Sequence, residues 1–147
     1  MNRKQVPIGL QLASTAKTVS RAFNDRLAEE GGSAPIWLIL SSLKRDAWRT
    51  QLDLARSLGI EGPTLTRHLD GLEEQGLVQR VRDASDRRAV RLELTDAGDA
   101  MFHRLRHAVV AFNRTLTNGL ADDELEQLRG TLDRLARNAE RATRGVD

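Results

Sequence analysis

The side chains best suited to chemistry in this sequence are arginines within residues 50–95. Arg67 lies in a segment with helical spacing, and Arg87 and Arg88 lie in a polar loop between two short alternating segments. A guanidinium is a planar donor that can bind guanine or phosphate through two parallel hydrogen bonds. These arginines therefore favour recognition of nucleic acid over the making and breaking of covalent bonds.

Arrangements typical of catalysis do not emerge from the sequence. We find no Ser-His-Asp set, glycine-rich phosphate loop or paired-carboxylate motif, so we expect no enzyme and no cofactor. His103 and His107 stand four residues apart, a spacing that can hold a metal ion. The segment HRLRH lacks the acidic residue of HExxH, and its two arginines repel a cation. We interpret the pair as a polar helix face and expect no metal, with a metal-responsive protein as an alternative.

Two short helices joined by a tight turn are predicted within residues 50–75. Thr50 and Asp53 have the form of a capping box at the start of the first helix. Gly59 ends that helix, and Pro63 is suited to open the next one. The apolar positions of the first helix predict its core face: Leu52, Leu54, Ala55 and Leu58. This arrangement is a helix-turn-helix.

The helix predicted over residues 63–75 has one apolar face and one polar face. At about 100° per residue, Leu65, Leu69 and Leu72 share a stripe that must face the core. Arg67 points to the opposite side from the N-terminal half, the half that enters the major groove in this motif. Pro63 lies on the same side, Thr64 and Thr66 lie on its flanks, and His68 lies nearer the core edge. The threonines can reach phosphates or a thymine methyl group.

Two β-strands with a projecting loop are predicted to follow. Residues 77–81 and 90–95 are rich in β-branched and apolar residues, and in the second run Val90, Leu92 and Leu94 alternate inward. Residues 82–89 are polar and form a hairpin tip, in which Asp86 is expected to pair with a neighbouring arginine. Such a ribbon can enter the narrow minor groove. The basic residues concentrated in it are Arg80, Arg82, Arg87, Arg88 and Arg91.

Residues 59–98 resemble the winged helix-turn-helix core of MarR-type transcriptional regulators, closest in pattern to the SlyA branch. The features that carry the resemblance are PTLTRHLDGLEEQGL, the wing signature ASDRRA and the exit LTDAG. The resemblance implies that Arg67 contacts bases and that Arg87 is the minor-groove residue of the wing tip. The full expected DNA-contacting set is Thr50, Gln51, Pro63, Thr64, Thr66, Arg67, His68, Arg82, Asp86, Arg87 and Arg88.

Long amphipathic helices are predicted on both sides of this core, over residues 8–31 and 96–143. A helix beginning after Ser33 is apolar nearly all round and is expected to be deeply buried. The long helices present more apolar surface than one small core can cover, so we expect them to pair with a second chain; folding back within a monomer is the alternative. A twofold dimer would place two recognition helices about 34–36 Å apart on a near-palindromic operator. We expect a single domain over residues 1–147, with residues 36–95 as its DNA-binding core.

A ligand pocket is implied only by the resemblance. MarR-type proteins commonly bind small aromatic or anionic ligands between the helical region and the DNA unit. Trp37 is a core candidate that could also line such a cavity. The pocket expected on this analogy consists of Lys17, Ser20, Trp37, Phe102 and Arg106.

Composition is consistent with one globular domain. The chain has 147 residues, no cysteine and a formal net charge of +2, so attraction to DNA must depend on where charges lie. It has neither a signal-peptide core nor an apolar run that approaches a membrane span, and we expect a cytoplasmic protein. The predicted fold is mainly α with a small antiparallel β-wing. We expect a homodimeric, sequence-specific DNA-binding regulator, more often a repressor; a winged-helix protein-interaction module is the remaining alternative.

Overall fold

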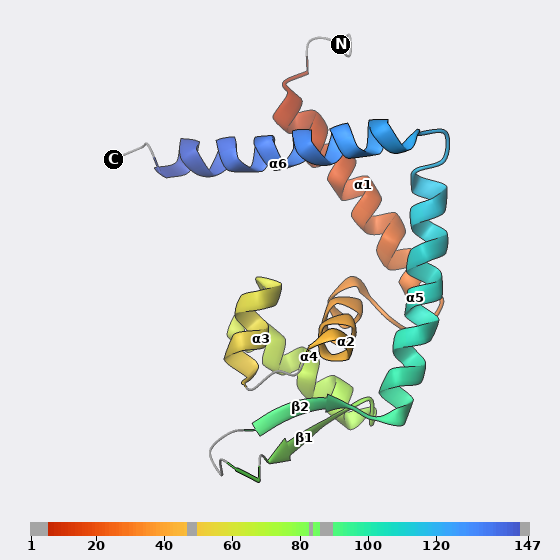
Figure 1. Ribbon diagram of the computed structural model, residues 1–147, viewed down its shortest axis with the longest axis vertical. Helices are drawn as coiled ribbons and strands as arrows, with labels where there is room; N and C mark the ends of the chain where they lie inside the picture. Colours follow the sequence, from red (N-terminus) through yellow and green to blue (C-terminus); the bar gives the residue numbers. More distant parts are fainter. Residues whose placement is uncertain (1–5, 47–49, 83, 86–89, 145–147) are drawn as a thin grey trace. The chain divides into compact units, whose positions relative to one another are not determined.

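The computed structural model describes residues 6–46, 50–82, 84–85 and 90–144, which form six helices and one two-stranded antiparallel sheet (Figure 1). Two compact units, Met1–Phe112 and Asn113–Asp147, divide the chain within α5. The predicted fold class is confirmed. The elements in order are α1 (Ile8–Ala28), α2 (Ala34–Arg45), α3 (Gln51–Leu58), α4 (Gly62–Glu74), β1 (Val78–Arg82), β2 (Val90–Leu94), α5 (Asp96–Leu116) and α6 (Asp122–Arg144).

A core of aliphatic side chains holds the first unit together. Each buried leucine or isoleucine contributes about 1.5–3 kcal/mol relative to an exposed one. Because α2, α3, α4, the sheet and α5 all contribute, the core fixes the position of α4. Its largest fully buried apolar side chains are Leu27, Ile39, Leu40, Leu54, Leu65, Leu69, Leu72 and Leu105.

Helix α2 begins where its sequence predicts. Gly31 adopts a positive φ of 79°, a conformation that favours glycine, and thereby reverses the chain after α1. The Ser33 hydroxyl then accepts a hydrogen bond from the Ile36 amide, with Pro35 in the first turn. Ile39 and Leu40 are buried, whereas Leu38 is exposed. The expectation that α2 is deeply buried is therefore wrong for Leu38, which is 43% exposed.

Helix α3 has the predicted ends but a narrower core face. Thr50 caps it by accepting a hydrogen bond from the Asp53 amide at 3.1 Å. At the other end Gly59 is left-handed with φ 63°, and the Ile60 amide donates to the Ala55 carbonyl. Leu52 was expected in the core but is 57% exposed. It lies two residues before Leu54, about 200° around the helix, so both cannot face the core.

The hairpin pairs Val78 with Leu94, Arg80 with Leu92 and Arg82 with Val90. Val78 and Leu92 are buried, but Val90 is exposed and does not face the core as predicted. The row that contains Val90 lies at the loop end of the hairpin, and both of its residues, Arg82 and Val90, are exposed. The hairpin is therefore anchored at one end only.

The N-terminus of α5 is locked to the turn between α4 and β1. The Thr95 hydroxyl accepts a hydrogen bond from the Gly98 amide at 3.0 Å and donates to the Gly76 carbonyl at 2.6 Å. A Cβ atom on Gly98 would lie 1.9 Å from the carbonyl oxygen of Leu77. Only glycine therefore permits this approach of the two backbones.

Helices α1 and α6 carry apolar side chains that the chain itself leaves exposed. In α1, Ile8 and Leu10 are 63% and 65% exposed, and in α6, Leu128 and Leu132 are exposed as well. No described residue of α6 is buried. In the described part of the chain, none of the helices has the length and apolar character that a membrane crossing requires.

Candidate nucleic-acid interface

Helix α4 presents a polar face that the core holds outward. Leu65, Leu69 and Leu72 are buried, as their spacing predicts, and Arg67 lies exposed on the other side. Pro63, Thr64 and Thr66 are exposed with it, and His68 is half-buried. Arg67 makes no ion pair with any described residue, so its guanidinium is free to bind a base. The face has the residue types that read the major groove.

The two helices of the helix-turn-helix are joined by side chains that the sequence predicted as DNA contacts. The Gln51 side-chain amide donates a hydrogen bond to the Thr66 hydroxyl, which itself donates to the Gly62 carbonyl. Thr50 is likewise occupied in capping α3. Gln51 and Thr66 thus join α3 to α4, a role that was not predicted for them, whereas Thr50 caps α3 as predicted.

The wing loop bears most of the remaining predicted contacts. Arg82 ends β1 and is exposed. Asp86, Arg87 and Arg88 lie outside the described residues, so the expected pairing of Asp86 and the minor-groove role of Arg87 remain predictions.

Two of the wing arginines form ion pairs within the protein. The Arg80 guanidinium pairs with Asp70 Oδ1 at 3.0 Å and with the Glu73 carboxylate, both on α4. Arg91 pairs with Glu93 at 3.3 Å. The prediction of one basic cluster is therefore wrong for Arg80, whose side chain is turned toward α4. The signal was available: Arg80 alternates with buried Val78 and thus shares its face.

Part of the expected ligand pocket comes together between α2 and α5. Trp37 and Phe102 stack with their ring centroids 5.6 Å apart and their planes 7° from parallel. Lys44 Nζ lies 5.9 Å from the centre of the Phe102 ring. Lys17, Ser20 and Arg106 are exposed, and in the described part of the chain no ring stacking or cation–π contact joins them to this aromatic pair.

The Lys44 ammonium also joins α2 to the first turn of α5. It donates a hydrogen bond to Asp99 Oδ1, and His103 Nε2 lies 3.5 Å from the other carboxylate oxygen. The hydrogen bond from Lys44 lowers the pKa of Asp99 below its ordinary value, assisted by the charges of Lys44 and His103. This carboxylate therefore stays ionised at neutral pH and secures the contact between the two helices.

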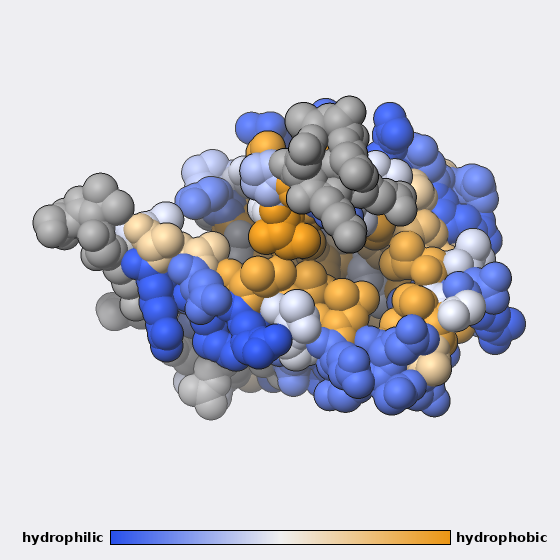
Figure 2. Space-filling model, turned by 90° about the horizontal axis from the view of Figure 1, so that it is seen from above, coloured by the Kyte–Doolittle hydropathy of each residue, from blue (hydrophilic) through white to orange (hydrophobic). Residues whose placement is uncertain are grey.

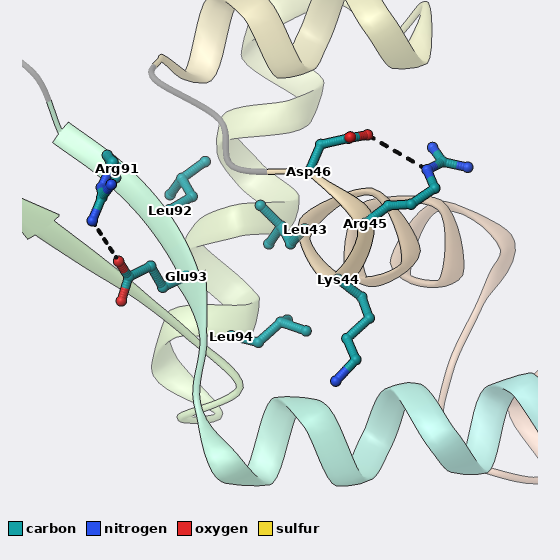
Figure 3. A pocket seen from close by; sticks show the side chains of 8 residues that line it. All are labelled: Leu43, Lys44, Arg45, Asp46, Arg91, Leu92, Glu93 and Leu94. Carbon is teal, nitrogen blue, oxygen red and sulfur yellow. Dashed lines mark hydrogen bonds and ion pairs between the residues drawn. The ribbon is translucent and has the colours of Figure 1, made fainter.

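A hollow of about 330 Å³ lies between the end of α2 and β2 (Figure 3). Leu43, Leu92 and Leu94 form its apolar lining. Its cations are already paired, since Lys44 binds Asp99, Arg45 binds Asp46 at 3.5 Å and Arg91 binds Glu93. It does not coincide with the predicted pocket.

The two histidines do not assemble a metal site with the described residues around them. His103 is exposed and next to Asp99, and His107 is exposed one turn further on. Among the residues that the structure describes, no three His, Cys, Asp or Glu side chains gather in a way that could hold a metal ion.

Comparison with known proteins decides the family. The MarR family model matches residues 33–90, the segment that contains α2, α3, α4 and β1. The structure of the transcriptional regulator PA3341 is 36% identical, with 92% of this chain and 99% of that chain covered and a TM-score of 0.76. This chain belongs to the MarR family. The family is one of transcriptional regulators.

Two further similar structures have been solved with DNA. The transcriptional repressor CouR, from Rhodococcus jostii RHA1, is 31% identical, with 88% of this chain and 92% of that chain covered and a TM-score of 0.80; it was solved with a 23-mer DNA duplex. A second CouR structure holds p-coumaroyl-CoA. A mutant MarR from E. coli complexed with operator DNA is 25% identical, with coverage of 90% and 95% and a TM-score of 0.77.

Proposed function

We propose that this MarR-family regulator is a homodimeric repressor that binds a near-palindromic DNA operator in a sequence-specific way. The observation that carries the proposal is the outward face of α4, on which Arg67 lies exposed and unpaired among the described residues. CouR, a repressor solved with a DNA duplex, and E. coli MarR solved with operator DNA support it by their likeness to this chain.

In this proposal each of the eleven expected residues acts on DNA in one of three ways. Arg67 reads the major groove. The residues around it, Pro63, Thr64 and His68, border the groove. Arg87 enters the minor groove, and Arg82, Asp86 and Arg88 support or orient it. Gln51 and Thr66 hold α3 against α4, Thr50 caps α3, and all three reach the phosphate backbone from the rim of the same surface.

The second copy of the chain covers the apolar side chains of α1 and α6. Each helix has exposed apolar side chains of its own, Ile8 and Leu10 on α1 and Leu128 and Leu132 on α6, and Figure 2 shows hydrophobic side chains open at the surface. Exposed apolar surface of this kind marks an interaction site. We therefore assign residues 8–31 and 96–143 to the dimerisation region and residues 36–95 to the DNA-binding core of a single domain, 1–147.

A small aromatic or anionic effector is the expected ligand. The stacked pair of Trp37 and Phe102, with the Lys44 ammonium beside it, supplies an aromatic surface and a positive charge. Lys17, Ser20 and Arg106 complete the proposed pocket. CouR bound to p-coumaroyl-CoA, a ligand with an aromatic acyl group and an anionic carrier, supports this chemistry.

Two finer assignments belong to the same proposal. The wing signature ASDRRA and the exit LTDAG favour the SlyA branch of the family. A regulator that binds the operator must work where the DNA is, so we place the protein in the cytoplasm.

The experiment is selection of duplexes from a random pool by the purified protein, followed by gel shifts. A near-palindrome with half-sites about one DNA turn apart is expected. Arg67→Ala should lose about 1–3 kcal/mol on the selected duplex and much less on random DNA. Arg56→Ala removes the same charge from an exposed position of α3 and should leave the ratio of the two affinities unchanged. Equal losses on both duplexes for Arg67→Ala would make it a phosphate contact and would contradict base reading.

A further inference from the structure

The side chain of Arg80 bridges two carboxylates on the recognition helix. One terminal nitrogen pairs with Asp70 Oδ1 at 3.0 Å, and the other pairs with the Glu73 carboxylate. Asp70 and Glu73 are three residues apart, so they are neighbours on one side of α4. The planar fork of a guanidinium can bind both at once, whereas a lysine ammonium is a single point charge.

The position of Arg80 in the hairpin gives this bridge its importance. A two-stranded hairpin is marginally stable by itself and needs a surface to pack on. The row of Val78 and Leu94 is packed on the core, and the next inward row pairs Arg80 with buried Leu92. The row after it, Arg82 with Val90, is exposed. Arg80 therefore binds the recognition helix from near the loop end of the hairpin, two residues before Arg82, the last residue of β1.

We propose that Arg80 is a positioning residue that fixes the wing to the recognition helix through Asp70 and Glu73. In doing so it sets where the wing leaves β1 relative to the base-reading Arg67, and hence the registration of the contacts of α4 and of the wing on one operator half-site. The proposal rests on the proposed function, since it concerns how that DNA site is aligned.

Removing the two carboxylate charges distinguishes a positioning role from a purely electrostatic one, because the two roles predict opposite effects on DNA binding. Asp70 and Glu73 carry two negative charges against the single charge of Arg80. Neutralising both reduces repulsion of DNA phosphates, so a purely electrostatic role predicts tighter binding to every duplex. A positioning role predicts that the wing loses its alignment and that its part of the operator is read less well.

The test compares Asp70→Asn/Glu73→Gln, Arg80→Gln and Arg80→Lys with the control Glu74→Gln. Glu74 is an exposed carboxylate on the same helix, and no described residue forms an ion pair with it. The affinities of the wild type and of Arg87→Ala are first measured on operators with single base-pair changes. Base pairs that the wild type discriminates but Arg87→Ala does not are defined as the wing positions. Discrimination at wing positions and at the positions read by Arg67 is then measured for each variant, with hydrogen exchange of β1 and β2 in the free protein.

For Asp70→Asn/Glu73→Gln we expect discrimination at wing positions to fall about three- to tenfold, a typical loss for a residue that couples two sites. Affinity for random DNA should stay equal or rise, and the strands of the hairpin should exchange faster. Arg80→Gln should show the same loss of discrimination, Arg80→Lys a smaller one, and Glu74→Gln none.

Unchanged discrimination and unchanged exchange in Asp70→Asn/Glu73→Gln would overturn the positioning role. A wild-type protein that selects no duplex would instead refute the proposed function, and the exchange measurement would still decide whether Arg80 holds the hairpin. If hydrogen exchange of β1 and β2 were faster in Glu74→Gln as well, the cause would be the loss of a negative charge from α4. That result would contradict a specific role for the ion pairs of Arg80.

Discussion

Replacing Gly98 with alanine tests the lock between α5 and the turn that follows the recognition helix. In an open helical position this change stabilises a protein by up to about 1 kcal/mol, because alanine has the higher helix propensity. At Gly98 the new Cβ would lie 1.9 Å from the Leu77 carbonyl oxygen and 2.9 Å from its carbonyl carbon. An ordinary contact needs about 3.4 Å, so the two backbones must separate by about 1.5 Å along that line.

Backbone atoms cannot move away as a flexible side chain can. Separation would also lengthen the bond from the Thr95 hydroxyl to the Gly76 carbonyl, now 2.6 Å. Overpacking typically costs about 1–3 kcal/mol. For a chain of this size, that cost lowers Tm by roughly 2–12 °C, at about 2–4 °C for each kcal/mol.

The assay is thermal unfolding at a fixed protein concentration, because dimer formation makes Tm depend on concentration. The matched control is Gly71→Ala in α4, where a Cβ would meet nothing within 4 Å. The control should melt at the wild-type temperature or above it. A rise in Tm for Gly98→Ala equal to that of the control would refute the argument that this backbone approach is required.

Three further changes test the wing, an ion pair and a helix cap. Arg87→Ala should weaken operator binding in gel shifts while leaving the dimer intact by size-exclusion chromatography; unchanged binding at moderate salt would exclude the minor-groove role. The lowered pKa of Asp99 means that its ion pair with Lys44 stabilises the fold above the ordinary carboxyl pKa and is lost as pH falls through the lowered value. Accordingly, the Tm difference between wild type and Asp99→Asn should be constant near neutral pH and shrink in acid; a difference that grows in acid would contradict this assignment. Thr50→Ala should cost about 1 kcal/mol in urea unfolding because α3 loses its cap, and no loss would show that the cap is dispensable.

Local features of this fold could be predicted because they depend on residues close together in sequence. The stripe of Leu65, Leu69 and Leu72 is set by helical spacing, and it is buried as predicted. Thr50 and Thr95 cap α3 and α5 through hydrogen bonds to amides three residues away. Arg67 was predicted to face outward for the same reason, since a buried stripe leaves the opposite side of the helix exposed.

Predictions failed where the outcome depended on what covers a side chain. Val90 lies in a regular strand on the same face as Leu92, yet Val90 is exposed whereas Leu92 is buried. Arg80 was counted as part of a basic wing, but its charge is taken up by Asp70 and Glu73. Glu73 is seven residues and Asp70 ten residues from Arg80 in the sequence, beyond the range over which local spacing is informative.

The sequence by itself determined the order of the elements, their ends and the residues that α4 turns outward. These follow from caps, left-handed glycines and apolar periodicity, which act over three or four residues. The tertiary structure alone decided which charges are free to meet DNA and which bind one another. It left Arg67 without an ion pair among the described residues, turned Arg80 toward α4 and stacked Trp37 on Phe102, because packing brings together side chains whose separation along the chain gives no sign of contact.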